Sequence, residues 1–161
     1  MKQQCHISMI YLSWLFYAGG FIALNLYSHW ALAILWLLAV PVAQWLYVRK
    51  FPSLSVSMGY GRIADQPAVT PPAQAPVKVT LYTALGCPFC PLLDQRLQIL
   101  QKSMNFTLER VDITLRPDLL ASKGIRSIPV VEVQGRFLFG LASSHDLAAA
   151  IGAAAPHPVA H

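Results

Sequence analysis

The sequence predicts a small mixed α/β domain that follows an N-terminal pair of membrane-spanning helices. Two observations predict this arrangement. The first 50 residues of the 161-residue chain are apolar and carry only three charged side chains. From residue 77 onward, short β-forming stretches alternate with helical periodicity in the order βαβαββα. That order predicts a mixed four-stranded sheet, because crossover helices join parallel strands and tight turns join antiparallel ones.

Two uncharged apolar segments make residues 1–50 the expected membrane anchor. They cover about residues 7–26 and 30–48, and each is close to the roughly 20 residues that a helix needs to cross a bilayer. A soluble helix of this length would show a polar face, whereas these segments are apolar nearly all round. Only a short turn separates them, so the sequence predicts a transmembrane helical hairpin.

The distribution of Lys and Arg predicts the orientation of this hairpin. Lys2 precedes the first segment, and Arg49, Lys50 and Arg62 follow the second. Because positive flanking charge favours the cytoplasmic side, we expect the domain that begins at residue 77 to be cytoplasmic in a multi-pass protein of a bacterial-type inner (plasma) membrane. The net charge of +5 forms no basic cluster beyond these flanking positions. The lipid bilayer is therefore an expected partner, and nucleic acid is not.

Composition divides the remainder of the chain into three parts. Residues 51–76 contain five prolines, which predicts a semi-extended linker. Residues 77–152 have the alternating pattern of a folded domain, and residues 153–161 are expected to be a disordered tail.

The folded domain is expected to open with a strand–helix–strand unit. Residues 77–82 alternate in the manner of a strand. The segment Cys-Pro-Phe-Cys follows, and leucines at helical spacing continue to about Lys102. Residues 106–111 are again β-forming, so the first two strands are expected to be parallel.

Turn and capping residues mark the later elements. Pro117 and Gly124 bound a short helix. Residues 128–133 and 136–139 flank the two-residue turn Gln134–Gly135, which predicts a β-hairpin. Ser143 or Ser144 is expected to cap a last helix that reaches about Ile151.

The pair Cys87 and Cys90 is the expected catalytic centre. A cysteine at a helix N-terminus is stabilised as a thiolate by free amides and the helix dipole, so Cys87 is the expected nucleophile and Cys90 the resolving thiol. A zinc half-site and an inert structural disulfide are the alternatives. A zinc site needs two more Cys or His ligands, and within the domain the sequence offers only His145, so no metal site is expected. Cys5 is interpreted as an incidental thiol near the membrane surface; the alternatives are acylation and reaction with the cysteine pair of a neighbouring chain.

Four segments together resemble a glutaredoxin: Leu81–Tyr82–Thr83, Cys87–Pro88–Phe89–Cys90, Ser127–Ile128–Pro129, and Gly140 through Asp146–Leu147. The resemblance covers roughly residues 77–152 and implies a small thioredoxin/glutaredoxin-like fold. It also implies that Pro129 is a cis-proline facing the two cysteines, where backbone groups pair with an extended substrate. The substrate-binding residues that we expect are Pro88, Phe89, Ile128, Pro129, Arg126, Ser143 and Ser144.

The expected function is that of a membrane-anchored thiol–disulfide oxidoreductase acting on disulfide-bearing proteins or glutathione mixed disulfides. No tightly bound cofactor is expected, and glutathione is a candidate reductant, although Ala84 stands where glutaredoxins commonly carry a glutathione-binding Lys. Two alternatives remain open. One is an exported oxidoreductase facing the periplasm, and the other is an iron–sulfur or metal carrier that uses Cys87.

Overall fold

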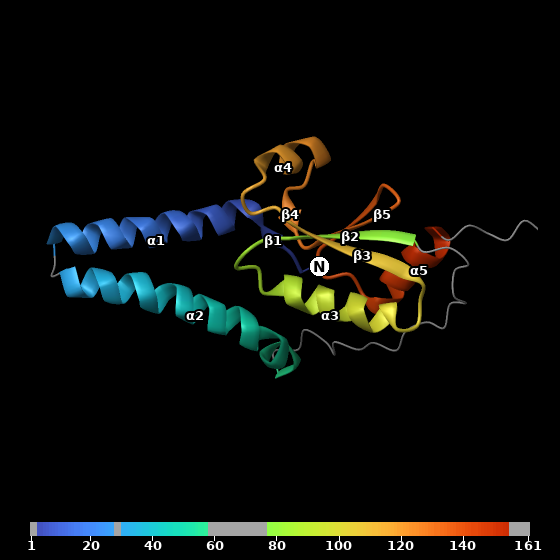
Figure 1. The fold of residues 1–161 in the computed structure, drawn as a ribbon, viewed down its shortest axis with the longest axis horizontal. Helices are drawn as coiled ribbons and strands as arrows, with labels where there is room; N and C mark the ends of the chain where they lie inside the picture. The colour runs from blue at the N-terminus through green and yellow to red at the C-terminus, as the bar shows by residue number, and fades with distance from the viewer. Residues whose placement is uncertain (1–2, 28–29, 58–76, 155–161) are drawn as a thin grey trace, which may run out of the picture.

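The computed structural model describes residues 3–27, 30–57 and 77–154 (Figure 1). A helical hairpin projects from a compact α/β domain, and most of the predicted linker and tail, residues 58–76 and 155–161, lies outside the described residues. The elements, in chain order, are β1 (Cys5–His6), α1 (Ile7–Tyr27), α2 (Trp30–Ser57), β2 (Val77–Thr83), α3 (Phe89–Gln101), β3 (Phe106–Asp112), α4 (Pro117–Lys123), β4 (Ser127–Ile128), β5 (Val130–Val133), β6 (Arg136–Phe139) and α5 (Ser144–Ala154).

The domain is built on a four-stranded mixed sheet in the order β3-β2-β5-β6. β2 pairs with β3 in parallel, and β5 pairs antiparallel with both β2 and β6. Gln134 and Gly135 both have positive φ, as the tight turn of a two-residue β-hairpin requires. The predicted fold class, with its crossover and its hairpin, is therefore confirmed.

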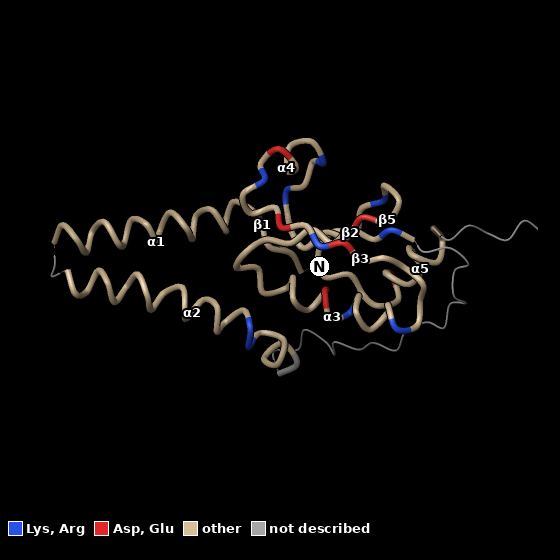
Figure 2. The backbone as a smooth tube through the Cα atoms, in the orientation of Figure 1, with Lys and Arg blue, Asp and Glu red and all other residues tan. Residues whose placement is uncertain are grey.

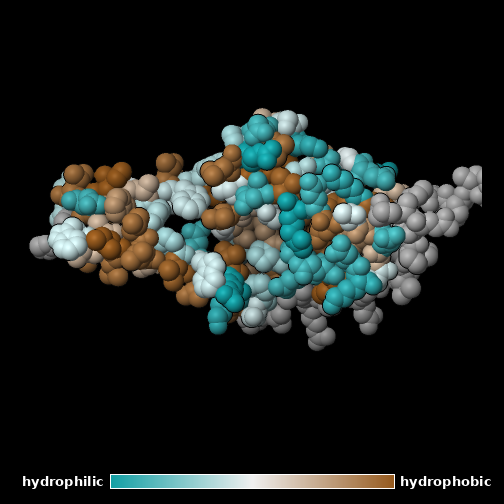
Figure 3. Space-filling view, viewed as in Figure 1, coloured by the Kyte–Doolittle hydropathy of each residue, from teal (hydrophilic) through white to brown (hydrophobic). Residues whose placement is uncertain are grey.

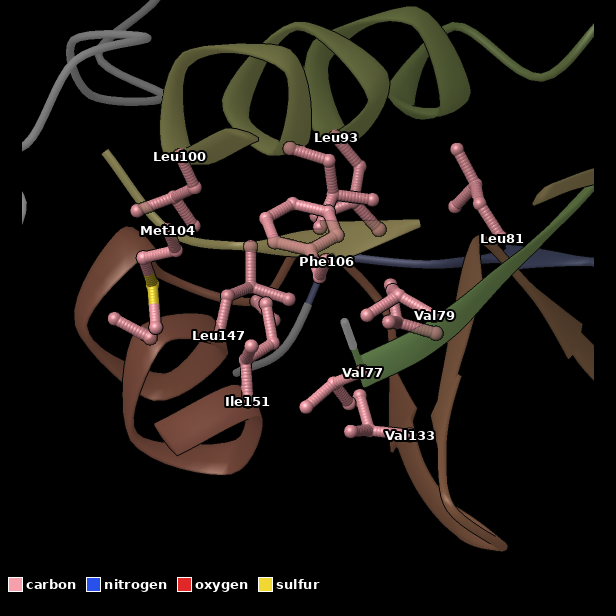
Figure 4. Packing of buried hydrophobic residues seen from close by; sticks show 14 residues of the cluster. Val77, Val79, Leu81, Leu93, Leu100, Met104, Phe106, Val133, Leu147 and Ile151 are labelled. Atoms are coloured by element: carbon pink, nitrogen blue, oxygen red, sulfur yellow. The ribbon is translucent and has the colours of Figure 1, made fainter. Parts of the chain in front are cut away.

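Helices cover both faces of this sheet, with α3 and α5 on one side and α4 on the other (Figure 1). Strand alternation sends Val77, Val79 and Leu81 to the α3/α5 side, where the leucines of α3 complete the main core (Figure 4). Tyr82, on the opposite face, joins a second cluster that includes both redox cysteines. The redox site is thus part of a hydrophobic core and is not on an isolated loop.

The hairpin consists of two helices that are long and apolar enough to cross a membrane, over Ile7–Tyr27 and Trp30–Ser55. Gly20 lets them approach closely, because a Cβ there would lie 2.8 Å from the Trp36 ring. Trp36 Nε1 donates to the Tyr17 carbonyl, and the Tyr17 hydroxyl donates to the Leu37 carbonyl. Apolar side chains dominate the outer surface of the hairpin (Figure 3).

The second helix extends further than the sequence predicts. It was expected to end at residue 48, with the linker beginning at residue 51, but α2 continues through Pro52 to Ser57. Phe51 is buried and packs edge to face against Phe89 of the redox domain, with ring centroids 5.4 Å apart. This tertiary contact holds a Pro-containing segment in a helix that its composition does not favour.

Among the described residues, charged side chains are confined to one end of the hairpin and to the α/β domain (Figure 2). Arg49 lies on α2 close to the domain, where its guanidinium sits over the Trp45 ring at 4.9 Å from the centroid. An Arg beside a Trp is typical of the level where a helix leaves the hydrocarbon region.

Candidate active site

The two redox cysteines lie where β2 gives way to α3. Gly86, with φ of +88°, turns the chain, and the Cys87 amide donates to the Ala84 carbonyl. Pro88 is the N-cap residue of α3, so Phe89 is the first helical residue and Cys90 the second. Both cysteines are buried, with relative exposures of 1% and 5%.

A proline loop lies against this pair. The Ile128–Pro129 peptide bond is cis, as the resemblance implies. Ile128 is fully buried in the same cluster as Cys87 and Cys90. The Pro129 carbonyl accepts a hydrogen bond from the Gly140 amide at 2.8 Å. The proline loop and the loop before α5 are therefore fixed relative to the two thiols.

The N-terminal segment crosses this proline loop, a contact that no sequence pattern predicts. β1 pairs antiparallel with β4, so that Cys5 lies opposite Ile128 and His6 opposite Ser127. The Ile7 amide donates to the Arg126 carbonyl at 3.3 Å.

Two further hydrogen bonds hold the segment just before Cys5. The Leu141 amide donates to the Gln3 carbonyl at 2.7 Å. The Ser127 hydroxyl donates to Gln4 Oε1 at 2.9 Å. The backbone edge of the proline loop and the loop before α5 thus bind one extended segment from both sides.

This pairing brings Cys5 into the redox site. Its sulfur lies 2.9 Å from that of Cys87, and all three cysteines are free thiols. The separation exceeds the roughly 2.05 Å of a disulfide bond and is short enough for reaction. The interpretation of Cys5 as an incidental thiol does not include this contact, since more than 80 positions separate Cys5 from Cys87 in the sequence. The one sequence feature that bears on the position of Cys5 is its closeness to the first apolar segment.

The ionisation of Cys87 differs from the sequence-based expectation of an easily formed thiolate. The hydrogen bond with Cys5 lowers its pKa, but the hydrogen bond with Cys90 and burial outweigh this and raise the pKa to about 12. The pKa of Cys5 is also raised, first by its hydrogen bond with Cys87 and then by burial. The backbone amide of Phe89, at the start of α3, lowers the pKa of both thiols. The helix effect is therefore present, but for Cys87 the hydrogen bond with Cys90 and burial override it.

The predicted substrate-binding residues occupy several distinct places. Pro88 and Phe89 lie between the cysteines, Ile128 packs in the same buried cluster as the cysteines, and cis-Pro129 follows Ile128. Arg126 is exposed, and its backbone carbonyl contacts the N-terminal segment.

The two serines of the predicted substrate-binding set lie at the start of α5. Ser143 caps the helix, accepting a hydrogen bond from the Asp146 amide, which confirms the predicted cap. Ser144 is the first helical residue, and it is buried. The Ser143 hydroxyl is therefore engaged in capping in this arrangement.

A cavity of about 500 Å³ separates the cysteine pair from the hairpin. Cys87 and Cys90 line one wall, and Trp14 and Trp45 of the two apolar helices line the other. Gly86 closes one side, because a Cβ there would lie 2.5 Å from Gln44 Nε2 of α2. The cavity thus leads to the two thiols from the side on which Trp14 and Trp45 lie.

Comparison with known proteins finds a family match in the α/β domain. Residues 78–152 match the family described as Glutaredoxin-like domain (DUF836). No curated protein matches the chain. One similar solved structure is the NTD_N/C domain of alkylhydroperoxide reductase AhpF from Enterococcus faecalis, with 28% identity, a TM-score of 0.44, and coverage of 48% of this chain and 38% of that one. Another is a mutant thioredoxin from Halobacterium salinarum, with 19% identity, a TM-score of 0.45, and coverage of 52% and 79%.

The chain thus spans 38% of the length of the reductase chain that it matches. The family match begins within β2 and ends within α5, so it contains the cysteine pair and the proline loop but not the apolar hairpin or β1. Residues 78–152 of this chain match the model of a glutaredoxin-like domain, and two long apolar helices precede the matched region.

Proposed function

We propose that this chain is a membrane-anchored dithiol–disulfide oxidoreductase that reduces disulfide-bearing proteins or glutathione mixed disulfides. The observation that carries the proposal is the position of the Cys87–Cys90 pair, at the start of α3 and against Pro129 in a glutaredoxin-like domain. One thiol at a helix N-terminus and a second one turn on provide an attacking and a resolving group.

The proposed reaction has two exchange steps. The Cys87 thiolate attacks one sulfur of a substrate disulfide, so that a mixed disulfide forms and the other substrate sulfur leaves as a thiolate. Cys90, as its thiolate, then attacks the Cys87 sulfur and releases the second substrate thiol. Two electrons pass to the substrate, and the enzyme holds a Cys87–Cys90 disulfide that a thiol reductant such as glutathione restores. The Phe89 amide, which hydrogen-bonds the Cys87 sulfur, favours the thiolate at each stage.

The hairpin supports a role at a membrane surface. Tyr11 of α1 donates to the Thr114 carbonyl, and Phe51 of α2 packs on Phe89, so both helices contact the redox domain directly. Trp14 and Trp45, which line the cavity beside the thiols, are residues that favour the headgroup level. The substrates that fit this placement are disulfides presented close to the bilayer.

A chain with both Cys90→Ser and Cys5→Ser tests the reaction by trapping its intermediate, since Cys5 lies 2.9 Å from Cys87 and would otherwise be a second thiol able to displace the partner. Without the resolving thiol, the attacked partner is expected to remain bound to Cys87 as a mixed disulfide. Non-reducing electrophoresis and mass spectrometry of the linked peptides would identify it. The matched control is Cys87→Ser, which is expected to capture no partner. Equal capture by both variants would contradict the assignment of the two roles.

Topology is tested separately, by labelling at Lys78, whose side chain is 72% exposed. In a background that lacks the three native cysteines, Lys78→Cys is expected to react with a membrane-impermeant maleimide only after the cells are permeabilised. This follows from the positive charge of Arg49 and Lys50 at the domain end of α2. Labelling in intact cells would assign the redox domain to the outer side and favour the exported enzyme.

A further inference from the structure

We propose that Cys5 is a third redox-active residue, which forms a reversible intramolecular disulfide with Cys87 while β1 occupies the substrate groove of its own chain. This inference rests on the proposed function, because it requires that Cys87 exchange disulfides. It adds a reaction partner supplied by the chain itself.

The backbone of the N-terminal segment binds in the manner of an extended peptide. It adds an antiparallel strand to β4, and specificity in such pairing comes from alternate side chains that face the protein. The register places Cys5 opposite Ile128, directly before Pro129. The hydrogen bonds from Leu141 to Gln3 and from Ile7 to Arg126 extend the contact beyond the two paired residues. The segment therefore occupies the edge where a substrate would pair.

The side chains complete this likeness to a bound substrate. Cys5 is half-buried and packs in the cluster that contains Cys87 and Cys90. Its sulfur is 2.9 Å from Cys87 Sγ, and the Phe89 amide hydrogen-bonds both sulfurs. His6, the next residue, is exposed, as the alternation of a strand requires. One position of β1 thus meets the nucleophile, and its neighbour points away.

The hairpin holds β1 in this position. α1 begins at Ile7, only two residues after Cys5. Ile10 is buried against the redox cluster, and the Tyr11 hydroxyl bonds the Thr114 carbonyl. Because the first turns of α1 are fixed to the domain, Cys5 is presented to Cys87 at an effective concentration of about millimolar or higher. A contact between Cys5 of one chain and Cys87 of another, at micromolar concentration, would form much less often than this contact within one chain.

The exchange is redox-neutral. It starts from the Cys87–Cys90 disulfide that substrate reduction leaves behind. Cys5 loses its proton to solvent, and its thiolate attacks Cys87 Sγ. A Cys5–Cys87 bond forms, the Cys87–Cys90 bond breaks, and Cys90 leaves as a thiolate that takes up a proton. The new disulfide fixes β1 in the groove, so substrates are excluded until a low-molecular-weight thiol reduces it with two electrons.

The experiment uses full-length Cys90→Ser chain in lipid nanodiscs, treated with oxidised glutathione and digested without reduction. Glutathione first attaches to Cys87, and Cys5 is then expected to displace it, leaving a Cys5–Cys87 linked peptide whose yield does not change with tenfold dilution of the protein. The matched control moves the thiol by one residue, with Cys5→Ser and His6→Cys added to the same background. A link from the moved thiol to Cys87 is expected to be at least about tenfold rarer.

Two outcomes would overturn the inference. In one, Cys87 stays glutathionylated while Cys5 remains free. In the other, the moved thiol links to Cys87 as often as Cys5 does. Either outcome leaves the proposed function standing, since Cys87 has reacted with the disulfide. If instead Cys87 never reacts, and neither the wild-type chain nor Cys5→Ser reduces a disulfide substrate, the proposed function itself fails.

Discussion

Replacing Cys87 with serine is expected to abolish disulfide reduction, with a loss of roughly a thousandfold or more, because a hydroxyl cannot replace the thiolate nucleophile. The substitution changes one atom in a site that is 1% exposed, so the fold around α3 and Pro129 should persist. The measurement is turnover of a glutathione mixed disulfide and of a protein disulfide by the full-length chain in nanodiscs.

Cys90→Ser provides the comparison. It retains the nucleophile, so it should still carry out the first exchange and lose only the intramolecular release. Circular dichroism and a thermal melt of both variants would show that the fold is intact. A Cys87→Ser chain that keeps more than a tenth of the activity, while Cys90→Ser loses it, would reverse the proposed order of attack.

The part of the fold that could be predicted from the sequence is the part with local signals. Pro117 and Gly124 bound α4 because one suits the first helical turn and the other adopts the left-handed conformation at its end. Gln134 and Gly135 form the hairpin turn for a similar reason. The apolar helices and the position of the cysteine pair at a helix start follow from patterns that span only a few residues.

The contacts that complete the site could not be predicted because they are non-local. β1 has two residues, which is too short for any periodicity, and its partner β4 lies more than 120 positions away. The extension of α2 depends on burial of Phe51 against the redox domain, whereas its proline content indicated a linker. Both features become visible only when the hairpin is packed against the domain.

The same limit applies to the ionisation of Cys87. The sequence shows that a helix follows this residue, and the Phe89 amide indeed lowers the pKa of the thiol. The hydrogen bond with Cys5 also lowers this pKa, but the hydrogen bond with Cys90 and burial outweigh both effects and change the direction of the net shift. Burial depends on tertiary contacts, so the start of a helix does not by itself determine the ionisation of this thiol.

Alkylation of Cys87 in the reduced chain is expected to be slow at neutral pH for this reason. Burial and the hydrogen bond with Cys90 raise its pKa from the ordinary 9.0 to about 12, so its thiolate fraction near pH 7 is much smaller than that of a free thiol. Because folding raises this pKa, the contribution of the thiol to stability is complete below pH 9 and is lost as the pH rises towards 12. Iodoacetamide modification, followed by mass spectrometry between pH 7 and 11, would measure the rate.

Variants of β1 test whether slow alkylation of Cys87 is due to β1 or to the Cys87–Cys90 pair alone. Cys5→Arg places a large cation where a half-buried thiol contacts Cys87, so β1 should leave the groove and alkylation of Cys87 should accelerate at least about tenfold at pH 7. His6→Arg is the matched control, since His6 is exposed and points away from the site. Alkylation of the wild-type chain at the rate of free cysteine, levelling off near pH 9, would show that β1 does not protect Cys87. Equal acceleration by both arginine variants would also contradict protection of Cys87 by β1. Charge on the N-terminal segment, and not departure of β1 from the groove, would then set the alkylation rate.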